Sequence, residues 1–260
     1  MFANQVSLFI VTSLDMDSII VLDIETSPVP WESFDDVQHE YLLRGAISDE
    51  DKDRKRAEMA LAPFTGMIVC VGFIHLQRTE SGLYDVVKKV CLVRDANDNE
   101  ELIKGETGDI AVVRTSEARM LRHFWSYVQQ QKETSRLHFV TFNGRGFDMP
   151  FLMLRSAALR VKPSVNLMNG TRFSYRDQHT DLLDEFTFFS PQQNGATRRF
   201  NLDFYTKSFG IVSPKSEGVD GSKVAKMYDQ GDYLGIAEYC MRDIEATWEL
   251  YGYWRDYLKF

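Results

Sequence analysis

An apolar run that ends in two acids constrains the fold of this chain more than any other feature. Residues 18–22 read SIIVL, and Asp23 and Glu25 follow directly with Ile24 between them. A short run rich in β-branched residues predicts a buried strand over 19–24. Because residues i and i+2 of a strand point to the same side, Asp23 and Glu25 should project together while Ile24 enters the core. The sequence therefore predicts a platform of two carboxylates at the end of a buried strand.

Other segments predict that strands alternate with helices in an α/β or α+β domain. Further strands are expected at 67–76, 84–93, 137–142 and 181–183. Helices are expected at 148–159, 222–230 and 232–257, with another beginning at Ser116. The polar segment 31–62 is expected to run over the surface as a helix or an irregular excursion. Both 31–62 and the polar segment 94–115 look like local additions.

The tripeptide Asp-Ile-Glu occurs a second time, at Asp243–Glu245, within a segment that predicts a helix. Residues i and i+2 of a helix do not face each other, whereas residues four apart do. Asp243 should therefore share a face with Tyr239, while Glu245 should point into solvent. A third acid-x-acid, Asp98–Glu100, lies in a polar stretch, so the pattern means little without its setting.

A third acid stands at a junction between a strand and a helix, in FNGRGFDMPFL at 142–152. Asp148 is expected as the N-cap of the helix, and a plain capping role is the alternative to a role in a site. Like charges that lie close together are costly, and hard divalent cations with oxygen ligands remove that cost. Several acids without His or Cys ligands therefore indicate Mg²⁺ or Mn²⁺, the setting of two-metal phosphoryl transfer.

Composition limits the function classes. The chain has 260 residues and a net charge of −8, which argues against a broad basic face on duplex DNA but not against a nuclease. No apolar run approaches the roughly 18–20 residues of a membrane span, so no membrane contact is expected. The three cysteines, Cys70, Cys91 and Cys240, are expected as buried free thiols in a reducing cytoplasm.

Three motifs stand in order along the chain: Asp23-x-Glu25, Asn143-x-x-x-Phe147-Asp148 and Tyr239-x-x-x-Asp243. This order resembles the DEDD 3′–5′ exonucleases in the variant with Tyr in the last motif. The similarity is closer to the exonuclease domain of family B DNA polymerases. It is closer still to a stand-alone group of predicted exonucleases related to that domain, and it covers roughly 18–257.

The resemblance implies a ribonuclease H-like fold, an α/β architecture with a central mixed five-stranded sheet flanked by helices. It also implies that 16–260 form a single 3′–5′ exonuclease domain. Residues 1–15, which precede Met16 and the first motif, are expected as a loose N-terminal extension or an upstream start.

The resemblance also implies roles for the acids. Asp23 would bridge two divalent ions, Mg²⁺ or Mn²⁺. Glu25 and Asp243 would hold the ion that carries the attacking water, and Asp148 would support the second ion through water. Tyr239 would orient the water, because a phenol with a usual pKa of ~10 stays protonated at neutral pH.

Contacts with the substrate are implied at several positions. Asn143 and Phe147 would lie near the terminal nucleotides, and the backbone around Ile24 and Thr26 would meet the 3′ end. The best basic candidates for phosphate contacts are Arg145, Lys215 and Lys223. Weaker candidates, with solvated surface charge as the alternative, are Arg155, Arg172, Arg176, Arg198 and Arg199.

Two further polar residues precede a predicted helix in RDQHTDLLDEF. His179 is expected on the surface or in a loop. Asp181 either ends a strand near the cleft or caps a turn, and the sequence leaves both open.

The function expected from the resemblance is hydrolysis of single-stranded DNA from the 3′ end to nucleoside 5′-monophosphates. The same chemistry on RNA or short oligoribonucleotides is the alternative within the class, and a catalytically silent nucleic-acid-binding module is the alternative outside it. The complete set of acids favours an enzyme. We expect a free-standing cytoplasmic nuclease that acts in replication or repair beside other proteins in trans.

Overall fold

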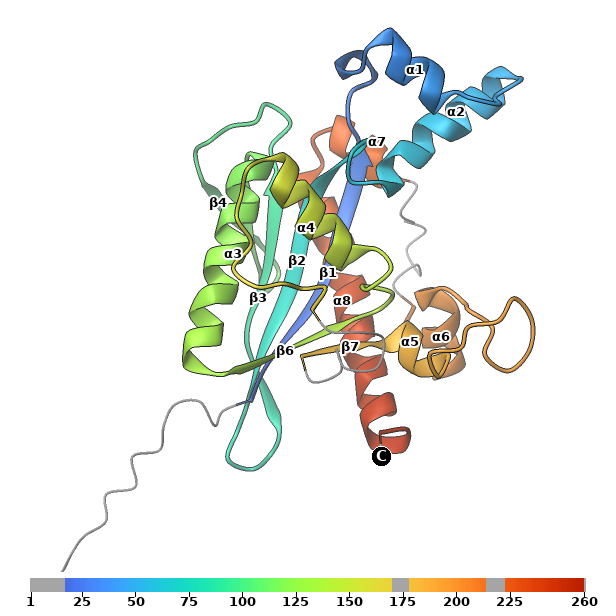
Figure 1. Cartoon of the computed structure of the whole chain (residues 1–260). Coiled ribbons are helices and arrows are strands. Elements are labelled where there is room, and N and C mark those ends of the chain that lie inside the picture. The colour runs from blue at the N-terminus through green and yellow to red at the C-terminus, as the bar shows by residue number, and fades with distance from the viewer. Residues whose placement is uncertain (1–16, 170–177, 214–222, 260) are drawn as a thin grey trace, which may run out of the picture.

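The computed structural model describes residues 17–169, 178–213 and 223–259, which build one mixed sheet with helices on both faces (Figure 1). The strands are β1 (Asp17–Pro28), β2 (Gly66–Arg78), β3 (Tyr84–Arg94), β4 (Ile103–Thr107), β5 (Ile110–Thr115), β6 (Arg136–Thr141) and β7 (His179–Asp181). The α-helices are α1 (Asp36–Leu42), α2 (Asp49–Glu58), α3 (Glu117–Thr134), α4 (Asp148–Ala158), α5 (Leu182–Phe186), α6 (Leu202–Ser208), α7 (Val224–Asp229) and α8 (Tyr233–Tyr257). Two short 3₁₀ helices, η2 (Trp31–Ser33) and η3 (Met59–Leu61), flank α1 and α2.

The sheet has seven strands in the order β4-β5-β3-β2-β1-β6-β7. Strand β2 runs antiparallel to β1 and β3, whereas β6 is parallel to β1 and β7 is parallel to β6. The predicted α/β class and mixed sheet with flanking helices are confirmed. The prediction of five strands is wrong.

The two strands that the sequence failed to indicate lie in the segment 94–115. Strands β4 and β5 form a hairpin whose turn contains Gly108 with a φ of 59°. Strand β4 is exposed along its three central residues, so its sequence carries no apolar signal. Strand β5 buries only Ile110, Val112 and Thr115 and is recognisable mainly through its parallel pairing with β3.

Alternation along β1 divides the core into two parts. Ile19 and Val21 pack on the face that α8 covers, while Ile20, Leu22 and Ile24 pack with α3 and α4 on the other face. All five side chains are buried. Each strand residue is thereby fixed to one face, because a shift of one residue would move the whole apolar set to the wrong side.

The polar segment 31–62 forms an arm that projects beyond the sheet (Figure 1). Helices α1 and α2 bury no residue, and each begins with a capping box, at Asp35 and Ser48. Helix α2 is held by ion pairs within itself, including Arg54–Asp51 and Arg56–Asp53. In the described parts of the chain, no helix combines the length and apolar character needed to span a membrane.

Candidate active site

The two acids of β1 lie on the face of the sheet that α8 covers. Asp23 pairs in register with Gly72 and Glu25 with Cys70, and a β-bulge follows between Glu25 and Thr26. Asp23 is half-buried and Glu25 is buried, while Ile24 enters the opposite core. The bulge changes the direction of the strand directly after the two acids, so their carboxylates stand at the point where the regular ladder is interrupted.

Asp148 reaches the same place from the start of α4. It is not the N-cap, as the sequence had suggested, because Phe147 occupies that position and the helix begins at Asp148 itself. Asp148 is 3% exposed, and its carboxylate accepts a hydrogen bond from the backbone N–H of Ile24 at 3.0 Å. This bond joins two segments 124 residues apart and places Asp148 against the backbone of the residue that separates the two acids of β1.

Helix α8 supplies Tyr239 and Asp243, which lie one turn apart. Tyr239 is 3% exposed, and Asp243 is the carboxylate that acts most strongly on its phenol. Burial, and then the neighbouring carboxylates, raise the pKa of Tyr239 well above its ordinary value. The phenol is therefore neutral throughout the physiological pH range.

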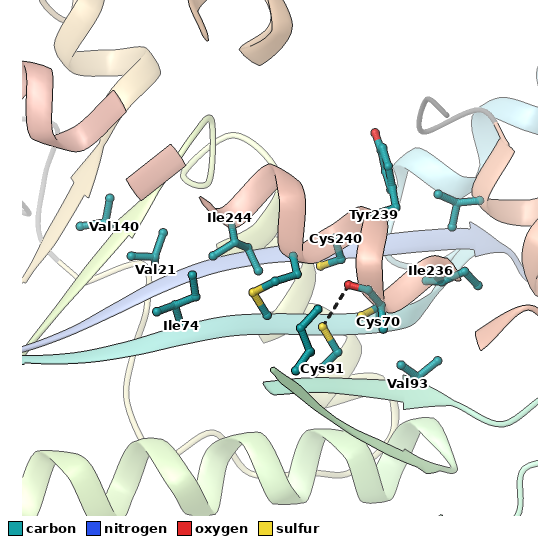
Figure 2. Packing of buried hydrophobic residues seen from close by; sticks show 14 of the residues in the cluster. Val21, Cys70, Ile74, Cys91, Val93, Val140, Ile236, Tyr239, Cys240 and Ile244 are labelled. Atoms are coloured by element: carbon teal, nitrogen blue, oxygen red, sulfur yellow. Dashed lines mark hydrogen bonds between the residues drawn. The ribbon is translucent and has the colours of Figure 1, made fainter. Parts of the chain in front are cut away.

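A third residue of α8, Cys240, contacts the acid platform. Its Sγ lies 3.7 Å from the carboxylate of Asp23, and one ligand atom each from Asp23, Glu25 and Cys240 lie within 4.8 Å of one another. Figure 2 shows Cys240 facing β1 and β2 beside Cys70 and Cys91, with Cys91 Sγ donating to a backbone oxygen of α8, that of Ala237, at 3.4 Å. All three thiols are buried and none is in a disulfide, as predicted.

The electrostatics of the cluster favour a bound cation. Burial, and then the charges of Asp148, Glu25 and Asp243, raise the pKa of Asp23 well above its ordinary value. The pKa of Glu25 is raised by burial and by Asp243 and Asp148, and burial raises the pKa of Asp148 to about 7. Buried carboxylates in mutual repulsion are stabilised by a hard divalent cation with oxygen ligands, so the donor set fits Mg²⁺ or Mn²⁺.

Asp181 fulfils both of the roles that the sequence had left open. It ends β7, and its Oδ1 accepts from the N–H of Leu183 at 3.1 Å as the N-cap of α5. The same carboxylate accepts from the N–H of Asn143 at 2.8 Å and, through Oδ2, from that of Arg145 at 2.8 Å. Asp181 thus fixes the loop that leads to Asp148, a role that no spacing in the sequence indicates.

The expectation that His179 lies on the surface is wrong. His179 is the first residue of β7, which pairs with β6 inside the sheet, and it is 3% exposed. Its Nε2 lies 2.8 Å from the hydroxyl of Thr141. Burial lowers the pKa of this imidazole to about 3, so His179 is a neutral core residue.

The candidate substrate residues lie in different settings. Asn143 has a left-handed φ of 63°, and its Oδ1 accepts from Arg199 Nη2 at 2.8 Å. Phe147 is half-buried and packs on Phe151 with ring centroids 5.3 Å apart. Thr26 follows the bulge and is half-buried.

The basic residues predicted to contact phosphates also differ in their surroundings. Arg145 is half-buried in the loop that Asp181 holds, and Lys223 is exposed before α7. Arg155 forms a buried ion pair with Glu117 at 2.6 Å, so it serves the core and not a phosphate. Lys215, Arg172 and Arg176 lie outside the described residues.

Comparison with known proteins places the chain in a family. Residues 81–257 match the model of a family described as predicted 3′–5′ exonucleases related to the exonuclease domain of PolB. The match covers more than half of the chain, which therefore belongs to this family. Asp23 and Glu25 precede the matched residues. Ile24, which lies between them, contacts the matched segment through its hydrogen bond to Asp148.

Individual relatives are more distant. The uncharacterized protein MJ0365 of Methanocaldococcus jannaschii is 27% identical over 150 residues, which are 55% of this chain and 77% of that protein. The family B DNA polymerase of the archaeon Pyrobaculum calidifontis superposes with a TM-score of 0.51 at 18% identity, over 92% of this chain and 24% of the polymerase. Escherichia coli exonuclease I, solved with a dT13 oligonucleotide, gives a TM-score of 0.45 at 12% identity, over 92% of this chain and 41% of that chain.

The polymerase comparison shows a shared fold. The resemblance to a ribonuclease H-like fold implies a mixed central sheet with helices on both faces, and the described residues have this arrangement. The chain spans about a quarter of the polymerase that it matches, so the activity of this chain has to be argued from its own site.

Proposed function

We propose that the protein is a metal-dependent exonuclease that removes nucleoside 5′-monophosphates from the 3′ end of single-stranded DNA. The observation that carries this proposal is the convergence of four acids from three distant segments. Asp23 and Glu25 come from β1, Asp148 from the start of α4 and Asp243 from α8, and their charges act on one another. Membership in a family of predicted 3′–5′ exonucleases supports the same assignment.

Two divalent ions, Mg²⁺ or Mn²⁺, fit this donor set. Asp23, whose carboxylate is affected by the charge of each of the other three acids, would help to hold both ions. Glu25 and Asp243 would hold one ion, and Asp148 would support the other. A pair of such ions stabilises the charge that develops on the attacking and leaving oxygens of a phosphodiester.

The residues around the acids would handle water and the substrate. Tyr239 cannot act as a base, because its phenol stays protonated, so we assign it the orientation of the attacking water by a hydrogen bond. Asn143 and Phe147 would hold the terminal nucleotides, and stacking on a phenyl ring would tolerate any base. Arg145, Lys223 and Lys215 would contact phosphates, and the backbone at Ile24 and Thr26 would meet the 3′ end.

A ladder assay tests the proposal. The protein is incubated with 5′-labelled DNA and RNA oligonucleotides of one sequence in Mg²⁺, Mn²⁺ or EDTA. Asp23→Ala serves as the site variant and Asp98→Ala, from the acid-x-acid in the polar segment, as the matched control.

We expect a descending ladder on DNA that EDTA and Asp23→Ala abolish and Asp98→Ala leaves intact. A ladder mainly on RNA would retain the mechanism and replace the substrate. A folded protein that binds oligonucleotides but shortens none in any metal would overturn the proposal in favour of a binding role.

A further inference from the structure

A short basic and aromatic segment lies against the loop that holds Asp148. We call Arg198, Arg199, Phe200 and Phe204 the basic–aromatic strip. Arg199 Nη2 donates to Asn143 Oδ1 at 2.8 Å, a contact across 56 residues. The strip therefore begins beside Asn143, a residue that we place next to the terminal nucleotides.

The aromatic part of the strip is a preformed flat surface. Phe200 and Phe204 stack with ring centroids 4.1 Å apart and an interplanar angle of 9°. Phe204 is 51% exposed, and the guanidinium of Arg198 lies over the ring of Phe200 at 5.0 Å from its centroid. Nucleobases stack on such aromatic faces, and arginine contributes through its planar cation.

The local backbone fixes the position of the two arginines. The loop before the strip is closed by hydrogen bonds from Gln192 N to Thr197 O at 3.1 Å and from Arg198 N to Gly195 O at 3.2 Å. Asn201 then caps α6 by accepting from the N–H of Phe204 at 3.0 Å. The strip is thus ordered before any ligand arrives, which lowers the entropic cost of binding.

The charge of the strip also points to an anionic partner. Arg198 and Arg199 are both exposed, and within the described residues no carboxylate forms an ion pair with either. The arginines of α2 differ, because Arg54 and Arg56 pair with acids of their own helix. In a chain with a net charge of −8, two adjacent arginines without acidic partners provide local attraction for a polyanion.

We propose that the basic–aromatic strip binds the single strand behind its 3′-terminal nucleotides, with the arginines on phosphates and Phe204 beneath a base. This inference rests on the proposed function and adds a second subsite to it. The acids would act on the last phosphodiester, while the strip would hold the part of the strand that has not yet entered the site.

The test is a binding titration that does not depend on turnover. A 5′-fluorescein thymidine dodecamer is titrated with the full-length protein in Ca²⁺ at several salt concentrations, and its anisotropy and subsequent integrity on a gel are recorded. The strip variants are the double variant Arg198→Gln/Arg199→Gln and the single variant Phe204→Ala. The matched control is Arg119→Gln/Arg122→Gln on α3, which removes the same charge from a helix remote from α6 (Figure 1).

We expect the arginine double variant to weaken binding roughly tenfold and to reduce the salt slope by about 1.4, because each lost phosphate contact on a single strand contributes ~0.7. Phe204→Ala should weaken binding severalfold through the lost stacking. The control should change affinity by no more than about twofold, because its arginines would touch no phosphate.

Equal losses in the strip and control double variants would overturn the inference, since net charge alone would then explain them. Failure of the wild-type protein to bind the dodecamer would overturn it as well. The ladder assay judges the proposed function separately. If the protein shortens DNA but the strip variants bind as the wild type does, only the second subsite is refuted. If the strip binds DNA but the protein shortens none, only the exonuclease activity is refuted.

Discussion

The tripeptide Asp-Ile-Glu occurs in two places, and the two copies contribute different numbers of acids to the site. In β1 both acids, Asp23 and Glu25, stand on the α8 side of the sheet and enter the cluster. In α8 only Asp243 enters the cluster, while Glu245 turns aside and pairs with Lys89 at 2.6 Å. The middle isoleucine is buried in both copies. The same three letters therefore supply two acids from a strand and one from a helix, because the side-chain period is two in a strand and 3.6 in a helix.

The two copies also meet in space. Gly72 pairs with Asp23, and a Cβ atom on Gly72 would lie 2.6 Å from Cys240 Sγ and 2.7 Å from Ile244 Cδ1. The absence of a side chain at this position lets α8 approach the sheet closely enough for Asp243 to join the acids of β1. Close approach of the backbone is a common reason for glycine within a strand.

The largest effect on activity is expected from substitution of an acid in the α8 copy of the tripeptide. We expect Asp243→Ala to lower kcat/KM by about a thousandfold or more, because it removes a proposed metal ligand from the site. Glu245→Ala should stay within about twofold, because Glu245 only forms a half-exposed ion pair. Steady-state hydrolysis of a labelled oligonucleotide measures both, and a similar loss in both variants would refute the difference between the two acids.

The second largest effect is expected from a substitution that pushes α8, with its copy of the tripeptide, away from the copy in β1. Gly72→Ala places a methyl group against Cys240 and Ile244, which we expect to cost about 1–3 kcal/mol of unfolding free energy and roughly a hundredfold in activity. Gly105→Ala in β4 is the matched control, since no atom lies within 4 Å of its added Cβ. Chemical denaturation and turnover report the two quantities. Unchanged activity in Gly72→Ala would show that the close approach is not required.

A smaller effect on activity is expected when the loop that leads to Asp148 loses one of the hydrogen bonds that hold it. Asp181→Asn replaces one carboxylate oxygen by an amide that cannot accept from the N–H of Arg145, so we expect kcat/KM to fall about 10–100-fold, in the range found for residues that orient ligands. Asp35→Asn, at the N-cap of α1, makes the same substitution in another capping position and should be neutral.

The effect of Asp181→Asn should appear as weaker Mn²⁺ binding and a lower kcat with little change in thermal stability. A loss explained entirely by unfolding, or equal behaviour of both Asn variants, would contradict the positioning role.

The pH dependence of stability should give the smallest effect. The pKa of Asp148 rises from an ordinary 3.8 to about 7 in the folded protein, so the folded state holds its proton more tightly than the unfolded chain. The resulting stabilisation is present below about pH 4 and is lost as the pH rises to about 7.

In EDTA, this contribution should lower the melting temperature by a few degrees between pH 5 and 8, and Asp148→Asn should flatten the decline. Added Mn²⁺ should remove most of this decline in melting temperature, because a cation stabilises the ionised form of the carboxylate. A melting temperature that rises over this range in EDTA, for the wild type but not for Asp148→Asn, would contradict the assigned shift.

The sequence predicted the parts of the site that depend on local periodicity. Alternation along β1 placed Asp23 and Glu25 together, and helical spacing paired Tyr239 with Asp243 and excluded Glu245. Asp181 and His179 could not be placed, since their roles come from the pairing of β7 with β6 and from contacts with a distant loop. The edge strand β4 was missed because its exposed residues show no apolar pattern, and β5 because its place in the sheet comes from its pairing with β3. Asp148 was misassigned as a cap by one residue.

The central claim is that the acids of β1, α4 and α8 together bind divalent metal ions, and calorimetric titration with Mn²⁺ tests it most directly. The two glutamates of the repeated tripeptide give the matched pair, Glu25→Gln and Glu245→Gln. The account predicts that Glu25→Gln weakens Mn²⁺ binding at least about tenfold while Glu245→Gln binds as the wild type does. Equal Mn²⁺ affinity in the wild type and both variants would contradict the claim.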